Sequence, residues 1–229
     1  MTLKTLATGS TGNCYILTSD NGKHLILEAG IPIKEIKKGL EFDVENIEGC
    51  ICTHVHLDHS KAIPDLQNMG IKVWQPYLDT EHKRIRTKLG EFEVECFDVP
   101  HGVECRAFLI TVDGTKILYA SDFEYIGYDL SSQNINVMLI ELNYQKDRIT
   151  EMDEHRKHTV LGHAEEQTTI EIIRHNMKHL RTVVLCHMSM SGALDRELAM
   201  KHIREVIPDY IDIQYARSGL EVNLDECPF

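Results

Sequence analysis

The 229-residue sequence has little positive charge, no long apolar run and no Cys-x-x-Cys pair. Its 24 lysines and arginines stand against 36 aspartates and glutamates, which gives a formal charge of −12 with histidine neutral. Such an acidic chain is a poor non-specific binder of nucleic acid, which argues against a processive nuclease with a broad basic groove. No apolar stretch is long enough to span a bilayer and the N-terminus has no signal-peptide pattern, so we expect no membrane partner.

The seven cysteines form an odd set without any Cys-x-x-Cys pair. Several of them lie inside apolar, strand-like runs, which favours buried reduced thiols and a cytoplasmic location. The sequence contains no repeats and no low-complexity tract. Strand and turn signals continue along its whole length, so we expect a single domain spanning residues 1–229, long enough to bury a sizeable core.

Apolar and alternating runs predict strands, and amphipathic runs predict helices. We expect strands at residues 3–6, 14–18, 24–27, 47–52, 72–74, 92–99, 108–112, 116–120, 137–142, 182–186, 211–214 and 220–224. We expect helices at residues 32–40, 60–69, 78–83, 168–178 and 196–206. Strands interleaved with helices predict an α/β layered sandwich. Residues 143–167 are the least regular part and are a candidate lid or substrate loop.

Residues 53–59 read Thr-His-Val-His-Leu-Asp-His and directly follow a predicted buried strand. Within six positions they carry His54, His56, Asp58 and His59, a density of metal-binding side chains that chance explains poorly. Neutral imidazole and carboxylate suit Zn²⁺ and related divalent ions. In extended backbone the first two rings point to one side, whereas the adjacent Asp58 and His59 diverge, which suits two neighbouring metals. Any one of these residues alone would be better interpreted as a satisfied polar group.

Three more potential ligands, His101, Asp122 and His187, come at or just after the ends of predicted strands. Each of them alone is more readily explained as a polar group that finds a hydrogen bond at a strand end. Together with residues 53–59 they give five histidines and two aspartates. Two metals with open positions need about six or seven protein ligands when one ligand is shared, so the set is sufficient.

On these motifs the chain resembles the metallo-β-lactamase-fold hydrolases over nearly its whole length. The resemblance implies an α/β, four-layered αβ/βα sandwich with two divalent metal ions at one edge, Zn²⁺ in first place and Mn or Fe as alternatives. It implies a first metal held by His54, His56 and His101, a second held by Asp58, His59 and His187, and Asp122 between them. The family usually has Asp at a further, mainly structural position after a strand, where this chain has Glu28.

Three further segments are similar to the YycJ/WalJ-like branch of this family, DNA exonucleases related to ribonuclease Z. They are the turn Gly9-Ser10-Thr11-Gly12-Asn13, the segment Glu141-Leu142-Asn143 and the pair Gly162-His163. The resemblance implies that His163 is a general acid which protonates the leaving oxygen and that Glu141 orients it. It also implies that Asp58 and Asp122 orient the attacking hydroxide. A helix-start histidine and a strand-end glutamate are the plainer interpretations of His163 and Glu141.

The chain also departs from that branch at several positions. Tyr144 replaces a usual histidine, Gly192-Ala193 replaces an asparagine pair, and Glu165 and Glu166 stand where phosphate-contacting groups are expected. These changes leave the metal ligands intact but leave the substrate open.

The favoured function is therefore a dinuclear, metal-dependent phosphodiesterase or nuclease that cleaves phosphodiester bonds of DNA or RNA by a metal-bound hydroxide. The charge of −12 and the compact length favour a small-molecule hydrolase as the alternative, such as a cyclic nucleotide phosphodiesterase, a lactonase or a thioesterase. A non-catalytic binding module is a third possibility, against which the full ligand set argues. Metal identity, DNA versus RNA, cleavage polarity and oligomeric state are left open by the sequence.

Overall fold

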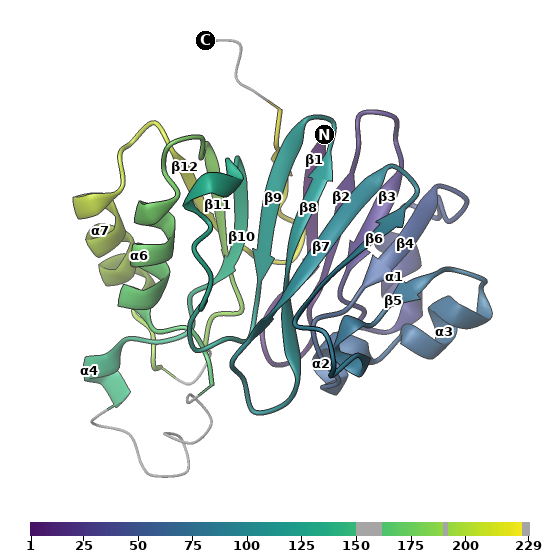
Figure 1. The fold of residues 1–229 in the computed structure, drawn as a ribbon, viewed down its shortest axis with the longest axis horizontal. Helices are drawn as coiled ribbons and strands as arrows, with labels where there is room; N and C mark the ends of the chain where they lie inside the picture. Colours follow the sequence, from purple (N-terminus) through teal and green to yellow (C-terminus); the bar gives the residue numbers. More distant parts are fainter. Residues whose placement is uncertain (150–161, 190–191, 226–229) are drawn as a thin grey trace.

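Two β-sheets lie face to face in the computed structural model, and helices cover the outer face of each (Figure 1). The structure describes residues 1–149, 162–189 and 192–225. The first sheet has the strand order β13-β1-β2-β3-β4-β5, and the second has the order β12-β11-β10-β9-β8-β7-β6. This layering confirms the predicted αβ/βα sandwich.

The strands and helices have the following bounds. The first sheet contains β1 (Thr2–Ala7), β2 (Cys14–Thr18), β3 (His24–Leu27), β4 (Ile47–Ile51), β5 (Val73–Trp74) and β13 (Glu221–Asn223). The second contains β6 (Arg84–Leu89), β7 (Phe92–Val99), β8 (Cys105–Val112), β9 (Thr115–Ala120), β10 (Val137–Glu141), β11 (Thr182–Cys186) and β12 (Asp212–Tyr215). The helices are α1 (Ile33–Gly39), α2 (Leu57–Ser60), α3 (Ile63–Asn68), α4 (Lys146–Ile149), α6 (Glu166–His175) and α7 (Arg196–Val206), with short 3₁₀ turns η1 (Pro76–Leu78) and η2 (Ser131–Gln133).

Apolar side chains form three cores, one between each pair of layers. The central core joins the two sheets, and Tyr15 and Tyr119 meet there edge to face with ring centroids 5.9 Å apart. A second core packs the outer face of the larger sheet against α6 and α7, and a third packs the smaller sheet against α1 and α3. Because strand side chains alternate between faces, β10 contributes Leu139 to the central core and Met138 to the outer one.

Strands β9, β10, β11 and β12 are parallel neighbours, so their carboxyl ends meet at one edge of the larger sheet. In the smaller sheet β3 and β4 are also parallel. Helices α2 and α4 lie at the same edge of the molecule, opposite the end that carries the N-terminus (Figure 1). In parallel α/β sheets this carboxyl edge is where ligands bind, and the predicted metal ligands follow these strands.

Two helix predictions were wrong in position or type. The expected helix at residues 78–83 is a 3₁₀ turn, η1, followed by the unpredicted strand β6. The alternating segment Arg84–Leu89 pairs antiparallel with β7, so cross-strand pairing decides its structure. The expected helix at 60–69 is two short helices, because Pro64 has no N–H to continue a helix and the Ala62 N–H bonds Ala29 O instead.

The candidate lid at residues 143–167 is described only in part. It includes α4 and the start of α6, while residues 150–161 lie outside the described residues. Within the three described stretches, no helix is both apolar and long enough to cross a bilayer.

Candidate metal centre

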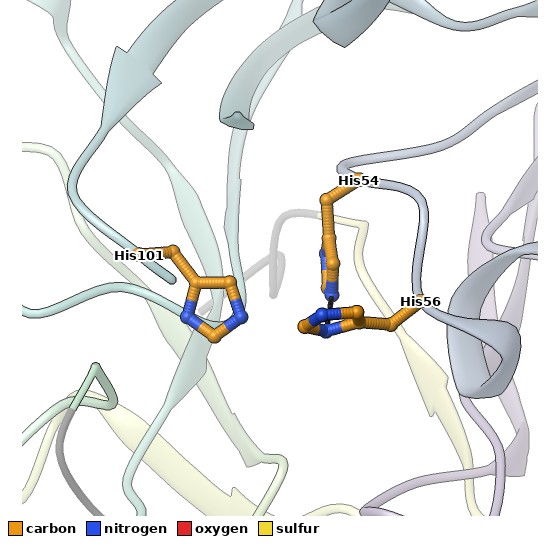
Figure 2. Close-up of side chains that lie close together, drawn as sticks. All are labelled: His54, His56 and His101. Carbon is orange, nitrogen blue, oxygen red and sulfur yellow. Dashed lines mark hydrogen bonds between the residues drawn. The ribbon is translucent and has the colours of Figure 1, made fainter. Parts of the chain in front are cut away.

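Three histidine rings converge at the junction of the two sheets (Figure 2). His54 and His56 lie on the loop between β4 and α2, and His101 lies on the loop after β7. Nε2 of His54 is 2.9 Å from Nδ1 of His56, and the ring centroids of His54 and His101 are 5.0 Å apart. One ring nitrogen from each of the three lies within 4.8 Å of the others, a spacing that a single cation can close.

A second group of the same kind lies beside the first. Asp58, His59 and His187 each present a ligand atom within 4.8 Å of the other two. Oδ2 of Asp58 is 3.5 Å from Nε2 of His59 and 3.9 Å from Nε2 of His187. His59 and His187 are buried, whereas Asp58 keeps a quarter of its side chain exposed at 25%. This second group faces solvent on the Asp58 side.

Asp122 lies between the two groups. Its Oδ2 is 3.8 Å from Nε2 of His54 and 3.9 Å from Nε2 of His101. Its Oδ1 is 3.4 Å from Nε2 of His59 and 3.3 Å from Nδ1 of His187. Each carboxylate oxygen thus faces one group, which is the placement that a shared ligand requires.

Three residues that follow strands at this edge, two ligands and one supporting residue, have left-handed backbone where the chain turns. Asp122 and His187 have φ values of 57° and 48°, and Glu28, behind the site, has a φ of 65°. A positive φ is unfavourable for residues with a Cβ and is held only where the surrounding structure fixes it. Several residues with positive φ at one edge of the sheets indicate that the surrounding structure constrains the backbone there.

The donor atoms fit a divalent metal. Nε2 of His101 and Nε2 of His187 are buried and have no hydrogen-bond partner in the described structure, although both point into the cluster. Leaving a buried polar nitrogen unpaired is unfavourable, and a bound cation would satisfy both. Nδ1 of His101 lies 2.8 Å from Gly162 O, so Nδ1 carries the proton and Nε2 presents its lone pair to the cluster.

The electrostatics keep His54 and His56 neutral. Burial lowers the pKa of His54 far below its ordinary value, and the neighbouring histidines lower it further. Burial and His101 also lower the pKa of His56. Since only neutral imidazole has a lone pair for a metal, these side chains are ready to bind a cation at neutral pH.

Glu28 supports the site from behind. Its carboxylate is fully buried and accepts hydrogen bonds from the Thr53 N–H at 3.1 Å and from the Tyr119 hydroxyl at 3.1 Å. The other carboxylate oxygen is 3.5 Å from Nδ1 of His59. Glu28 therefore orients the His59 ring, as an outer carboxylate does in many metal sites.

Glu141 and His163 lie together next to the second group. Oε1 of the buried Glu141 is 2.8 Å from Nδ1 of His163 and 2.8 Å from Nδ1 of His187. Its Oε2 accepts hydrogen bonds from the backbone N–H groups of Phe123 and Ala164. Burial alone would lower the pKa of His163, but the charge and hydrogen bond of Glu141 raise it above its ordinary value.

Two supporting residues were not predicted as part of the site. The buried Asn13 amide lies 3.0 Å from Nε2 of His59, and Asn143 donates to Glu141 Oε1 at 3.0 Å and to His187 O at 2.8 Å. Both belong to segments that had only indicated a family branch. Their presence in those segments was the one sign in the sequence that they could belong to the site. The sequence spacing does not predict which distant residues they contact.

Glu165 and Glu166, which differ from the residues expected in the exonuclease branch, have structural roles. Glu165 caps α6 by accepting from the Gln167 N–H. Glu166 Oε1 is 3.1 Å from Gln145 Nε2 and 3.1 Å from Nδ1 of His202 on α7. Neither carboxylate adds to the ligand cluster.

The fold and this edge site define a protein of the metallo-β-lactamase fold. Residues 7–94 match the family model described as the metallo-beta-lactamase superfamily. The chain is similar to an exodeoxyribonuclease YycJ of Bacillus anthracis, with 24% identity over 89% of this chain and 88% of that protein. The resemblance predicted from the sequence is confirmed, and the matches support the predicted enzyme class, a metal-dependent hydrolase of ester bonds.

Solved structures agree on the fold. The metallo-β-lactamase fold protein YhfI from Bacillus subtilis has a TM-score of 0.72 at 18% identity, covering 96% of this chain and 98% of that chain. The short form of human tRNase Z, ELAC1, has a TM-score of 0.69 at 14% identity, covering 99% of this chain and 100% of that chain.

Proposed function

We propose that this protein is a dinuclear, metal-dependent phosphodiesterase that cleaves phosphodiester bonds in nucleic acid. The observation that carries the proposal is the position of Asp122 between two three-residue ligand groups, beside the His163–Glu141 pair. The exodeoxyribonuclease and tRNase Z similarities support a nucleic acid as the substrate.

The proposed metal ligands are the seven residues of the cluster. His54, His56 and His101 would hold one cation, Asp58, His59 and His187 the other, and Asp122 would be shared. When bound, two divalent cations, Zn²⁺ in first place, would stabilise negative charge on phosphate oxygens and lower the pKa of a water to near 7. Asp58 and Asp122 would accept the hydrogen bonds that orient the attacking oxygen.

His163 is the proposed general acid. Glu141 accepts the hydrogen bond from its Nδ1 at 2.8 Å, so Nε2 is the nitrogen that can give a proton to the leaving oxygen. The raised pKa of His163 favours the protonated ring that a general acid requires. Glu141 positions the ring and, through the same oxygen, the ligand His187.

The test is cleavage by metal-reconstituted protein of end-labelled single- and double-stranded DNA and RNA, beside bis(p-nitrophenyl) phosphate. His59→Ala removes a buried ligand, and His56→Ala removes the most exposed ligand of the first group with less risk to folding. Metal-dependent cleavage of a polymer that both variants lose supports the proposal, and the products give its polarity. Metal-loaded protein that cleaves no phosphodiester contradicts it.

The alternative is a small-molecule hydrolase, favoured by the net charge of −12. A nuclease should bind polymer with an affinity that falls steeply with salt, because phosphate contacts release counterions. A small-substrate enzyme should show a weak salt dependence. Turnover of bis(p-nitrophenyl) phosphate without polymer cleavage would favour a small phosphodiester, and turnover only of lactones or thioesters would exclude phosphodiester chemistry.

A cytoplasmic location is part of the proposal. The six cysteines within the described residues are all buried and form no disulfide with one another. Free buried thiols are typical of proteins that work in a reducing compartment.

A further inference from the structure

A groove of about 450 Å³ runs between α6 and the segment 123–131 that follows Asp122. The side chains that line it include Tyr125, Ile126 and Leu130 from the segment and Thr168, Ile172 and Asn176 from α6 and its C-terminal end. This volume is in the range of small-molecule sites in proteins. No proposed metal ligand and neither member of the Glu141–His163 pair lines it, so it is a feature separate from the metal cluster.

Both walls of the groove begin at the proposed catalytic groups. One wall leaves Asp122, and the Glu124 N–H bonds Pro100 O directly before His101. The other wall is α6, which starts three residues after His163. Since Nδ1 of His163 is 4.0 Å from Oδ2 of Asp122, the two walls start close together.

The walls then run side by side away from that edge (Figure 1). From Thr168 to Asn176 the helix rises about 12 Å, at ~1.5 Å per residue. Tyr125 follows Asp122 by three residues, so their Cα atoms are at most about 11 Å apart. The start of the groove therefore lies within reach of a group attached to a phosphate at the metal cluster.

The wall chemistry matches an aromatic, uncharged group. The Tyr125 side chain is 55% exposed, and its hydroxyl and that of Thr168 make no hydrogen bond within the described part of the chain. Tyr128 is held in place by a hydrogen bond to Asp98 and by edge contact with Phe97 at 5.2 Å between centroids. An exposed tyrosine on a fixed wall is the kind of platform on which nucleobases stack.

Acceptor groups predominate among the polar atoms of the groove. The carboxylates of Asp129 and Glu171 line it, and Nδ1 of His175 is used by Glu171 O at 2.7 Å, which leaves Nε2 as an acceptor. Such a surface repels phosphate and suits hydrogen-bond donors. The exocyclic amines of adenine, cytosine and guanine are donors of this kind, whereas thymine has no exocyclic amine.

A second cavity, of about 330 Å³ on the outer face of β6 to β9, is a weaker candidate. Four of its charged side chains pair with one another, Arg86 with Glu95 at 2.9 Å and Lys88 with Glu93 at 3.4 Å. It has no connection to the metal cluster in the described contacts. The groove along α6 is the feature that continues from the reacting groups.

We propose that the groove is the leaving-group subsite and binds an amino-bearing nucleobase (adenine, cytosine or guanine) stacked on Tyr125. This inference rests on the proposed phosphodiesterase function and names the part of the substrate that the site recognises. It predicts that the base next to the scissile bond, rather than further phosphates, supplies substrate affinity in this acidic protein.

The experiment compares the dinucleoside monophosphates dApdA and dTpdT with metal-loaded wild-type protein and variants. Wild type should hydrolyse dApdA with the higher kcat/KM. Tyr125→Ala should raise the KM for dApdA about 5- to 100-fold, the loss expected when one stacking platform is removed. Tyr125→Phe should stay within about twofold of wild type because the ring is kept. Glu171→Gln should reduce the preference for dApdA over dTpdT.

Controls separate this inference from the proposed function. Tyr210→Ala removes another exposed tyrosine, 73% exposed between α7 and β12, and should leave the KM unchanged. All variants should keep the metal content and the thermal midpoint of wild type, so a folding or metal defect would be visible. A wild-type KM for dApdA in Tyr125→Ala would overturn the inference while leaving the phosphodiesterase proposal intact.

Nucleoside binding can be measured without catalysis. In ¹H–¹⁵N spectra, adenosine should shift the amides of residues 123–131 and 168–176 of wild type but not of Tyr125→Ala. If wild type hydrolyses no phosphodiester, the proposed function fails, and these shifts still test whether the groove binds adenosine. Absence of shifts at millimolar adenosine would overturn the subsite.

Discussion

The side-chain nitrogen of Asn13 lies 3.0 Å from Nε2 of His59, although 46 positions separate them in the sequence. The Asn13 oxygen accepts from the Gly9 N–H at 2.8 Å, which fixes the amide so that its NH₂ faces His59 and Asp58 O. The Asn13 backbone N–H also bonds Asp58 O at 2.7 Å. The glycine turn thereby holds the Asp-His end of the metal-binding motif.

Removing this amide should weaken the second ligand group. Because the amide also bonds Asp58 O, Asn13→Ala is expected to loosen the Asp58–His59 segment and to lower the affinity for the metal of the second group about 10- to 100-fold, the usual loss when an outer-sphere partner is removed. Titration with Co²⁺, followed by its visible absorption and by calorimetry, measures both sites. Asn21→Ala, at an exposed turn where the side chain meets only Glu91, is the matched control. Unchanged affinity at both sites would show that Asn13 does not support the metal centre.

His163→Ala should affect substrates according to their leaving group. Turnover of a dinucleotide, whose alkoxide needs a proton, should fall about 10²- to 10⁴-fold. Turnover of bis(p-nitrophenyl) phosphate should fall less than about tenfold, because p-nitrophenolate leaves without a proton. Equal losses on both substrates would mean that His163 has another role, such as holding Glu141 and His187.

Metal removal should destabilise the folded protein. Two buried ring nitrogens, Nε2 of His101 and Nε2 of His187, are unpaired without a cation. Adding Zn²⁺ at 100 times its Kd should stabilise the fold by about 2.7 kcal/mol per site, seen as a higher thermal midpoint. In His56→Ala the increase should shrink, since one ligand of the first group is gone. A thermal midpoint that does not respond to any divalent cation in wild type would contradict the metal centre.

The acid side of the stability profile should depend on Glu95. Burial alone would raise its pKa, but hydrogen bonds from Arg84 and Arg86 hold the pKa below its ordinary value. A carboxyl group whose folded pKa is lowered contributes stability above its unfolded pKa of about 4.3 and loses it as the pH falls through the folded pKa. Glu95→Gln should therefore cost up to about 1 kcal/mol at pH 7 and less at pH 3, because this stabilisation is lost as the pH falls through the folded pKa.

Urea denaturation at pH 7 and pH 3, at fixed metal concentration, measures this difference. Glu205→Gln, an exposed site on α7, is the control and should change neither value. A Glu95→Gln deficit that is the same at both pH values would point to lost packing instead of lost charge.

The local sequence pattern predicted most strands correctly, because the contacts of these segments in the fold favour the same structure as their own sequence. The runs Cys14–Thr18, Phe92–Val99 and Thr182–Cys186 were predicted with their observed bounds, and so was the helix Arg196–Val206. Each has a clear period and clear turn residues at its ends.

The region after β5 was mispredicted because distant contacts decide it. The guanidinium of the buried Arg106 donates to Asp79 O at 2.7 Å, which holds the segment after η1 against β8. Polar composition at residues 78–83 favours a helix only when such contacts are ignored.

The candidate ligands were predictable because they are close in sequence or follow strands. Their supports were not: His101 is oriented by the backbone oxygen of Gly162, 61 positions away, which any residue type would supply. The assignment of the seven ligands and of His163 and Glu141 to metals and chemistry stays a prediction that the experiments above test.

The pairing of β1 with β13 has a consequence for how the protein is made. Thr2, the first residue of β1, pairs with Asn223 near the far end of the chain. While the ribosome is still adding residues, that side of β1 is an open strand edge, and open edges attract other chains. The six-stranded sheet cannot close until position 223 has emerged, long after His187 has been added. A nascent chain therefore holds all seven candidate metal ligands before its first strand has both neighbours, and the edge of β1 stays open to other chains until residue 223 has emerged.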